Sequence, residues 1–162
     1  MISIKGRVQV WECIFKDCKA LCCTPPLITM GDVRRISKSM GLKPEEFLDI
    51  DENEEKGLFR IKGKGSRCMF LQDDYSCKLH GKNSKPVFCQ MFPFRFDGIT
   101  YADEIILKIK PAENCPGYGR GRKIDEKFML RIEELGSELV REIESYLKEK
   151  NKGRKFEEIL KS

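Results

Sequence analysis

Hydrophobic side chains recur every three or four residues over the last quarter of the chain, and this spacing predicts one long helix. From residue 124 to about residue 150, Glu, Lys and Arg occupy one face. The opposite face carries an apolar stripe of Phe128, Ile132, Leu135, Leu139, Ile143 and Leu147. Gly153 then ends the helix, and residues 155–160 are expected to add a last turn.

A shorter helical pattern begins near residue 30. Thr29 and Asp32 have the spacing of a capping box, in which each side chain binds the other residue's backbone N–H. Apolar residues at helical spacing and a glycine stop follow, namely Val33, Ile36, Met40 and Gly41. Pro44 is expected to open a second short helix that turns Phe47 and Leu48 inward.

Alternation of apolar and polar residues predicts short strands in the rest of the chain. These strands are expected at residues 2–10, with a break at Gly6, and at residues 57–65, 67–71 and 101–109. Residues 92–96 are aromatic-rich and expected to be extended because of Pro93, whereas the acidic run 49–55 is expected to be a solvated loop. The chain is therefore predicted to be a small single α+β domain. It has short helices, short antiparallel strands, Cys-rich irregular loops and a long C-terminal helix.

The length of 162 residues fits one domain with a single core. Nothing approaches the roughly 18 consecutive apolar residues of a membrane span. The first residues lack a basic segment followed by an apolar one, so no signal peptide is expected. We therefore expect a cytoplasmic protein that does not enter a membrane.

Eight cysteines accompany a single histidine, and they are the candidate functional residues. They are Cys13, Cys18, Cys22, Cys23, Cys68, Cys77, Cys89 and Cys115. Soft thiolate ligands select zinc, iron–sulfur clusters or Cu(I) over hard cations. The first four lie within eleven residues, and the adjacent Cys22 and Cys23 point in different directions in either a helix or a strand. These two are expected to play different parts, one of them serving a different metal or none.

Known cysteine templates do not fit these spacings. No C-x2-C pair is present, the ferredoxin run is absent, and a radical S-adenosylmethionine pattern fails at Pro25. Two other interpretations stay open. The thiols could be buried hydrophobic groups, or they could be disulfides, as in intracellular proteins of hyperthermophiles; the Lys- and Glu-rich composition is typical of thermophiles. His80 is expected to be exposed or hydrogen-bonded and not to be a metal ligand.

The charge distribution argues for anionic sites among the cysteines. Residues 1–67 and residues 68–123 each carry a net charge of +3, while residues 124–162 carry −1. Four thiolates on Zn²⁺, or on an oxidised four-iron cluster, total −2, and nearby cations offset that charge. A sequence pI near 8.7 is below the range typical of nucleic-acid-binding domains, and the acidic second helix of the 29–49 pair would repel phosphates. Nucleic acid is therefore not an expected partner.

The segment 115–123 allows two interpretations. Its glycines and arginines could form a backbone nest for an anion, with Arg120 and Arg122 as cationic walls. No strand and no GK[ST] pattern surround it, so a flexible basic turn is the favoured interpretation.

The ordered motifs over about residues 11–122 closely resemble the CxxCxxCC cysteine-cluster family. They are the Cys-Cys pair after a Cys-rich approach, Asp32-Val-Arg-Arg-Ile, Cys68-Met-Phe-Leu, Cys77-Lys-Leu-His, Lys85-Pro-x-x-Cys, Phe92-Pro-Phe and Cys115 with a Gly tail. The family is described as a zinc- or iron-chelating domain, is often labelled an iron–sulfur oxidoreductase, and includes flagellin lysine N-methylases. The chain departs from it in the spacing of the first cysteines, and in having Lys85 and Gln90 where the family tends to have Arg.

The resemblance implies a metal-binding protein in which the eight cysteines hold an iron–sulfur cluster (4Fe–4S) or zinc. It implies a redox or electron-transfer role with a redox partner protein, and leaves open whether the chain is an oxidoreductase. The alternatives are a protein-lysine N-methyltransferase and a non-enzymatic structural zinc module. Residues 1–123 would form the cysteine-cluster metal-binding domain, and residues 124–162 the amphipathic helix packed on it. The phenylalanines of residues 92–96 are expected to pack beneath the Cys89 loop and keep water from the metal.

Overall fold

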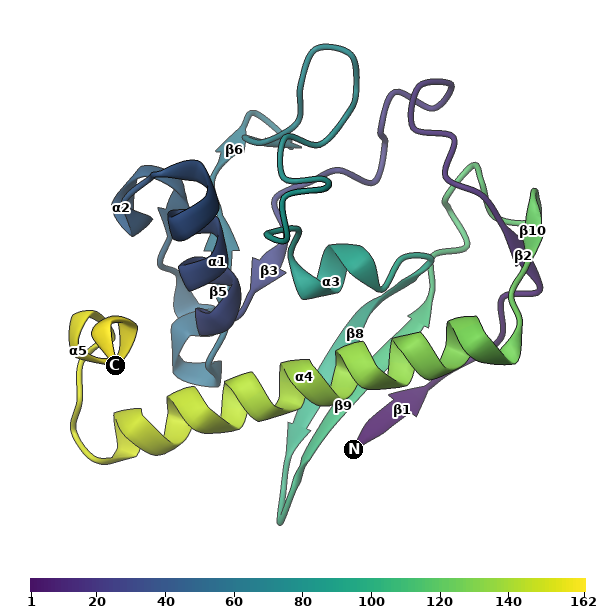
Figure 1. Ribbon diagram of the computed structural model, residues 1–162. Helices are drawn as coiled ribbons and strands as arrows, with labels where there is room; N and C mark the ends of the chain where they lie inside the picture. Colours follow the sequence, from purple (N-terminus) through teal and green to yellow (C-terminus); the bar gives the residue numbers. More distant parts are fainter.

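The computed structural model describes residues 1–162 and has the predicted α+β architecture. A long helix, α4, crosses the whole molecule and packs on a small sheet and on helix α1 (Figure 1). The helices are α1 (Met30–Met40), α2 (Pro44–Phe47), α3 (Val87–Gln90), α4 (Glu126–Asn151) and α5 (Phe156–Lys161). None of them is long and apolar enough to cross a membrane.

The largest sheet has three strands in the order β1-β9-β8, with bounds Ile2–Ile4, Ile105–Pro111 and Phe94–Tyr101. Strands β8 and β9 form an antiparallel hairpin, whereas β1 is parallel to β9, unlike the antiparallel pairing expected throughout. The strand predicted over residues 101–109 is present as β9, but it begins only at Ile105, because Tyr101 ends β8 and the chain reverses after it. In this turn the Ala102 N–H donates to the Glu104 carbonyl at 3.3 Å.

The second sheet and two ribbons are built from very short strands. The sheet has the order β3-β5-β4, with bounds Leu27–Ile28, Phe59–Ile61 and Leu48–Asp49. The ribbons pair β6 (Gly63–Lys64) with β7 (Arg67–Cys68), and β2 (Val10–Trp11) with β10 (Arg122–Lys123). The predicted strands at 57–65 and 67–71 are therefore present in shorter form, divided between the sheet and a ribbon.

Two predicted segments differ from the structure. The expected break at Gly6, which adopts a φ of +93°, is present, but the strands on its two sides, β1 and β2, belong to different sheets, and residues 7–9 are not part of a strand. The acidic run is not a simple solvated loop: it contains the end of β4 and a 3-10 helix, η1 (Glu52–Lys56). Within η1, Glu54 accepts a hydrogen bond from the Tyr146 hydroxyl at 2.7 Å and pairs with Lys150 at 2.9 Å.

Helix α4 contributes to both hydrophobic cores. Its first half packs on the β1-β9-β8 sheet and α3, while Tyr146 near its end packs with α1, β5 and α5. In the predicted stripe, Ile132, Leu135, Leu139 and Ile143 are buried, and Phe128 and Leu147 are partly buried. Asp125 caps the helix by accepting from the Phe128 N–H at 2.9 Å. This single element therefore fixes the sheet relative to α1.

Candidate metal-binding site

The cysteines lie on irregular segments that gather on one side of the fold, away from the C-terminal half of α4. Cys13, Cys18, Cys22 and Cys23 lie on the loop between β2 and β3. Cys68 ends β7, Cys77 lies on the β7–α3 loop, Cys89 lies in α3, and Cys115 lies on the loop between β9 and β10. Figure 1 shows the β2–β3 and β7–α3 loops side by side above α3. Four separate stretches of sequence thus meet in one region.

The β2–β3 loop has no helix or strand and is held by successive turns and by one arginine. Cys18 N–H donates to the Ile14 carbonyl at 3.1 Å, and Cys23 N–H donates to the Ala20 carbonyl at 2.9 Å. The Arg67 guanidinium, on β7, donates to the carbonyls of Lys19 at 2.5 Å and Ala20 at 2.8 Å. Arg67 therefore anchors the loop with the first four cysteines to the β6–β7 ribbon.

Backbone contacts also join distant cysteines directly. The Cys68 N–H donates to the Cys23 carbonyl at 3.1 Å. Beyond Cys68 the chain turns back, because Leu71 bridges to Cys77, and the Cys77 carbonyl accepts from the His80 N–H at 3.1 Å. These contacts bring Cys23, Cys68 and Cys77 into one neighbourhood.

Cys115 approaches the β2–β3 loop from the other side. The Glu12 N–H donates to the Gly117 carbonyl at 3.3 Å, and the Tyr118 N–H donates to the Cys115 carbonyl at 2.9 Å. A Cβ at Gly117 would lie 1.8 Å from the Glu12 carbonyl oxygen, so only glycine permits this approach. The residue after Glu12 is Cys13, which is thereby placed beside the Cys115 turn.

Cys89 is positioned by helix α3, which the residue pattern did not predict. The Val87 N–H donates to the Asp32 carboxylate at 3.2 Å, and Asp32 is completely buried. Asp32 also completes the predicted capping box with Thr29, as the two backbone N–H groups are bound at 3.1 and 3.2 Å. The start of α1 is therefore connected directly to the start of the Cys89 helix.

Aromatic residues pack next to this region, as expected for residues 92–96. Phe94 is buried, and the Phe96 ring contacts the Phe88 ring edge-to-face with centroids 5.4 Å apart. Phe92 lies against Trp11 at 6.2 Å. The segment becomes part of strand β8 from Phe94 onward.

The thiols influence one another's ionisation. Burial raises the pKa of Cys13, and the nearby Cys115 and Cys18 raise it further. Burial, Cys115, Cys13, Cys23 and Cys18 together raise the pKa of Cys22 to about 12.

A second set of thiols interacts around Cys68. The Cys23 and Cys68 thiols interact, which raises the pKa of Cys23 and lowers that of Cys68. Cys77 and Cys89 oppose the lowering of the Cys68 pKa. Burial raises the pKa of Cys89, with further contributions from Cys77, Asp32 and Cys23. Thiolates crowded in this way need compensating positive charge.

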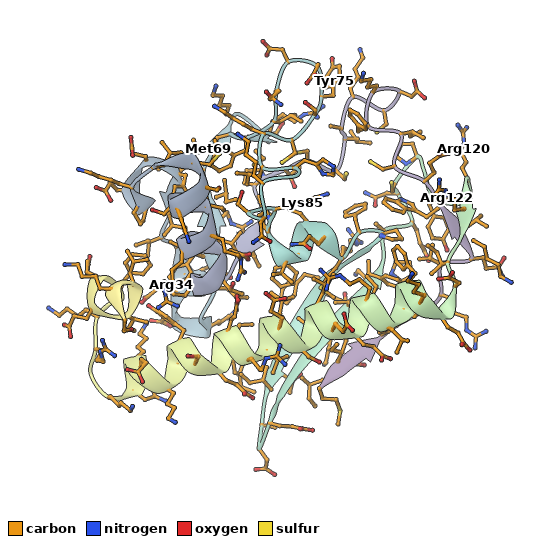
Figure 2. The ribbon with its side chains drawn as sticks, in the orientation of Figure 1. Arg34, Met69, Tyr75, Lys85, Arg120 and Arg122 are labelled. Atoms are coloured by element: carbon orange, nitrogen blue, oxygen red, sulfur yellow. The ribbon has the colours of Figure 1, made fainter.

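Lys85 supplies positive charge close to the thiols. Its ammonium group lowers the pKa values of Cys13, Cys23 and Cys89. Figure 2 shows Lys85 near the middle of the molecule, just before α3, whereas Arg120 and Arg122 lie at its outer edge beside β10. One cation thus acts on cysteines from three segments of the chain.

The donor set fits zinc or iron–sulfur chemistry by type, since thiolates are the preferred ligands of both. The side chains as they lie do not form a finished coordination shell: no three His, Cys, Asp or Glu side chains converge closely enough to hold an ion. Cys68 is buried, Cys13 and Cys22 are exposed, and the other five are half-buried. All eight are free thiols, so the structure contains none of the disulfides considered as an alternative.

The structure also bears on two other interpretations of the sequence, those of the 115–123 segment and of His80. The 115–123 segment uses its backbone N–H groups internally, because Tyr118, Gly119 and Arg120 all donate to carbonyls within the chain. This agrees with a basic turn rather than an open anion nest. His80 is exposed, as expected.

The residue pattern did not predict the contributions of Arg67, Gly117 and the Asp32–Val87 contact. Arg67 directly precedes Cys68, but nothing in the pattern says which carbonyls its side chain reaches. Gly117, two residues after Cys115, was a detectable signal, because a glycine near a proposed ligand often marks a close backbone approach.

Comparison with known proteins identifies a family. The family model CxxCxxCC, described as "Putative zinc- or iron-chelating domain", matches residues 12–116. Neither a curated protein nor a solved structure matches the chain. The matched region contains all eight cysteines and most of the fold. The chain therefore belongs to the CxxCxxCC family of zinc- or iron-chelating domains.

Proposed function

We propose that this protein binds an iron–sulfur cluster through its cysteines and uses it in electron transfer. The observation that carries the proposal is the convergence of four cysteine-bearing segments. The Cys68 backbone N–H donates to the Cys23 carbonyl, and the Glu12 N–H, next to Cys13, donates to the Gly117 carbonyl near Cys115. All eight cysteines, Cys13, Cys18, Cys22, Cys23, Cys68, Cys77, Cys89 and Cys115, are the proposed ligand set.

The type and number of donors support thiolate coordination. The only histidine is exposed, and sulfur is the one ligand type that all the converging segments supply. Lys85 and Arg67 provide positive charge near the thiols, which offsets the −2 charge of a four-thiolate centre. The charges of the surrounding residues thus suit an anionic metal centre.

The exposure of two cysteines supports a redox role. Cys13 and Cys22 are exposed, so a centre bound there lies near the surface, within reach of a partner protein. A bound cluster would supply one-electron chemistry, and its potential depends on solvent exposure and hydrogen bonds to sulfur. The residues of this chain would set that exposure: Phe92 and Trp11 pack together on the side of the β2 strand.

A structural zinc site is the second candidate, and the irregularity of the cysteine loops favours it. The β2–β3 loop runs from Glu12 to Pro26 with neither helix nor strand. Metal binding stabilises such loops, because the free energy of coordination contributes to folding. In either case, residues 1–123 are the proposed metal-binding unit and residues 124–162 the helical support.

Purification without oxygen, followed by metal analysis and a visible spectrum, tests the proposal. An iron–sulfur protein will contain iron and sulfide and show broad absorption near 400 nm that bleaches on reduction. A colourless protein that contains zinc supports the structural candidate instead. A protein without bound metal, which stays without it after supply of Fe²⁺ and sulfide or of Zn²⁺, contradicts both. The methyl-transfer alternative stays a prediction, tested by transfer from S-adenosylmethionine to a lysine-bearing protein.

A further inference from the structure

The neighbours of Cys22 and Cys23 differ, although the two residues are adjacent in the chain. The pKa of Cys22 is raised by the nearby charges of Cys115, Cys13 and Cys18, as well as by that of Cys23. The Cys23 carbonyl instead accepts a hydrogen bond from the Cys68 N–H at 3.1 Å, and the nearby Cys68 thiol raises the pKa of Cys23. The two sulfurs therefore face separate sets of cysteines.

The first set occupies the outer side of the β2–β3 loop. The charges of Cys115 and Cys18 raise the pKa of Cys13. The hydrogen bond from the Glu12 N–H to the Gly117 carbonyl fixes the loop against the Cys115 turn. The Cys18 N–H donates to the Ile14 carbonyl, which folds the loop back toward Cys13. Cys13, Cys18, Cys22 and Cys115 thus form one group, which we call group one.

The second set lies between the β6–β7 ribbon and helix α3. Cys23, Cys89 and Cys77 are close enough to change the pKa of Cys68. Cys77 and Cys23 likewise raise the pKa of Cys89. The bridge between Leu71 and Cys77 turns the start of the β7–α3 loop back on itself, three residues after Cys68. Cys23, Cys68, Cys77 and Cys89 form group two.

We propose that the chain holds two separate metal centres, one in group one and one in group two, joined by the peptide bond between Cys22 and Cys23. This inference rests on the proposed function and specifies its sites. Four thiolates complete the shell of one tetrahedral zinc ion or supply the four ligands of one four-iron cluster. Eight thiolates exceed what either needs, and the two groups each contain four.

Lys85 fits an arrangement with two centres. Its ammonium lowers the pKa values of Cys13 in group one and of Cys23 and Cys89 in group two, so its positive charge is near both groups. Two four-thiolate centres carry about −4 in total, and a cation close to both reduces their mutual repulsion.

Two double variants that differ by one chain position test the division. Native mass spectrometry counts the Zn²⁺ ions bound per chain after the protein is loaded with Zn²⁺ alone. The wild-type chain is expected to bind about two ions. Cys13→Ser/Cys22→Ser removes two ligands of group one and is expected to keep one ion at wild-type affinity. Cys13→Ser/Cys23→Ser removes one ligand from each group and is expected to keep no ion at wild-type affinity, because three thiolates and a water bind Zn²⁺ more weakly than four thiolates. His80→Ala serves as a control with unchanged binding.

The outcomes separate this inference from the proposed function. Equal metal loss in the two double variants, or a single ion in the wild-type chain, overturns the two-centre assignment while leaving metal binding intact. No ion in the wild-type chain overturns the proposed function itself. Cys13 and Cys22 are exposed, so their double variant is expected to fold, and circular dichroism checks this. If the variant with Cys23→Ser does not fold, retention of one ion by Cys13→Ser/Cys22→Ser still supports two centres, and complete loss or complete retention overturns them.

Discussion

Asp32 is predicted to make the stability of the protein depend on pH in an unusual direction. Its carboxylate is completely buried and accepts bonds from the Thr29 and Val87 N–H groups and from Arg35 at 2.8 Å. Burial raises the pKa of Asp32 to about 6, against the attraction of Arg35 and with a further rise from Glu142. Desolvation of the charged form therefore outweighs the ion pair.

The sign and size of the effect follow from this pKa. The folded chain holds a proton on Asp32 between about pH 4 and pH 6, whereas the unfolded chain, with the ordinary value of 3.8, releases it. The free energy of unfolding contributed by Asp32 therefore falls as the pH rises through this window. At about 1.4 kcal/mol per pKa unit, the loss is about 3 kcal/mol.

Urea unfolding, followed by circular dichroism from pH 4 to pH 7, measures the effect. Asp32→Asn cannot titrate, so the wild-type chain should lose about 2 kcal/mol relative to this variant between pH 4 and pH 7, the rest of the loss falling below pH 4. Taking the difference removes the titration of the cysteines, which both chains share. Asp49→Asn, at an exposed position, is the control and should show no change with pH relative to wild type. A difference between wild type and Asp32→Asn that stays constant, or grows in favour of wild type as the pH rises, would refute the reasoning.

Three further perturbations test the site and its support. Gly117→Ala places a Cβ 1.8 Å from the Glu12 carbonyl oxygen and should reduce the amount of metal bound per chain. The control Gly136→Ala places a Cβ 2.2 Å from Ile2 Cδ1; it should cost about 1–3 kcal/mol of stability and leave the metal content unchanged. Removal of metal by a chelator should lower the melting temperature by many degrees; a fall produced by reductant alone would indicate disulfides instead. Tyr146→Phe removes the buried hydroxyl that binds Glu54 and should cost about 1–2 kcal/mol in urea unfolding, while no change there would show that this bond contributes nothing.

Elements with strong local signals could be predicted from the sequence. The apolar stripe of α4 and its Asp125 start lie within a few residues of the expected bounds, since a long amphipathic helix is determined by its own periodicity. The Thr29–Asp32 capping box is present with both bonds. These features need no information about distant residues.

Features that depend on distant partners could not be predicted. Helix α3 has only four residues, and its start is fixed by Asp32, 55 positions earlier. The turn between β8 and β9 was missed because Ala102-Asp103-Glu104 carries no Gly or Pro signal. The resemblance implied the eight cysteines together, but their grouping depends on contacts such as the one between Cys23 and Cys68, 45 positions apart, which spacing alone does not reveal.

X-ray absorption at the edge of the bound metal tests the central claim most directly, because it reports which atoms coordinate the metal. For protein purified without oxygen, cysteine coordination predicts a first shell of sulfur, at about 2.3 Å if the metal is zinc. A first shell of oxygen or nitrogen would show that the metal is not held by the cysteines and would contradict the proposal.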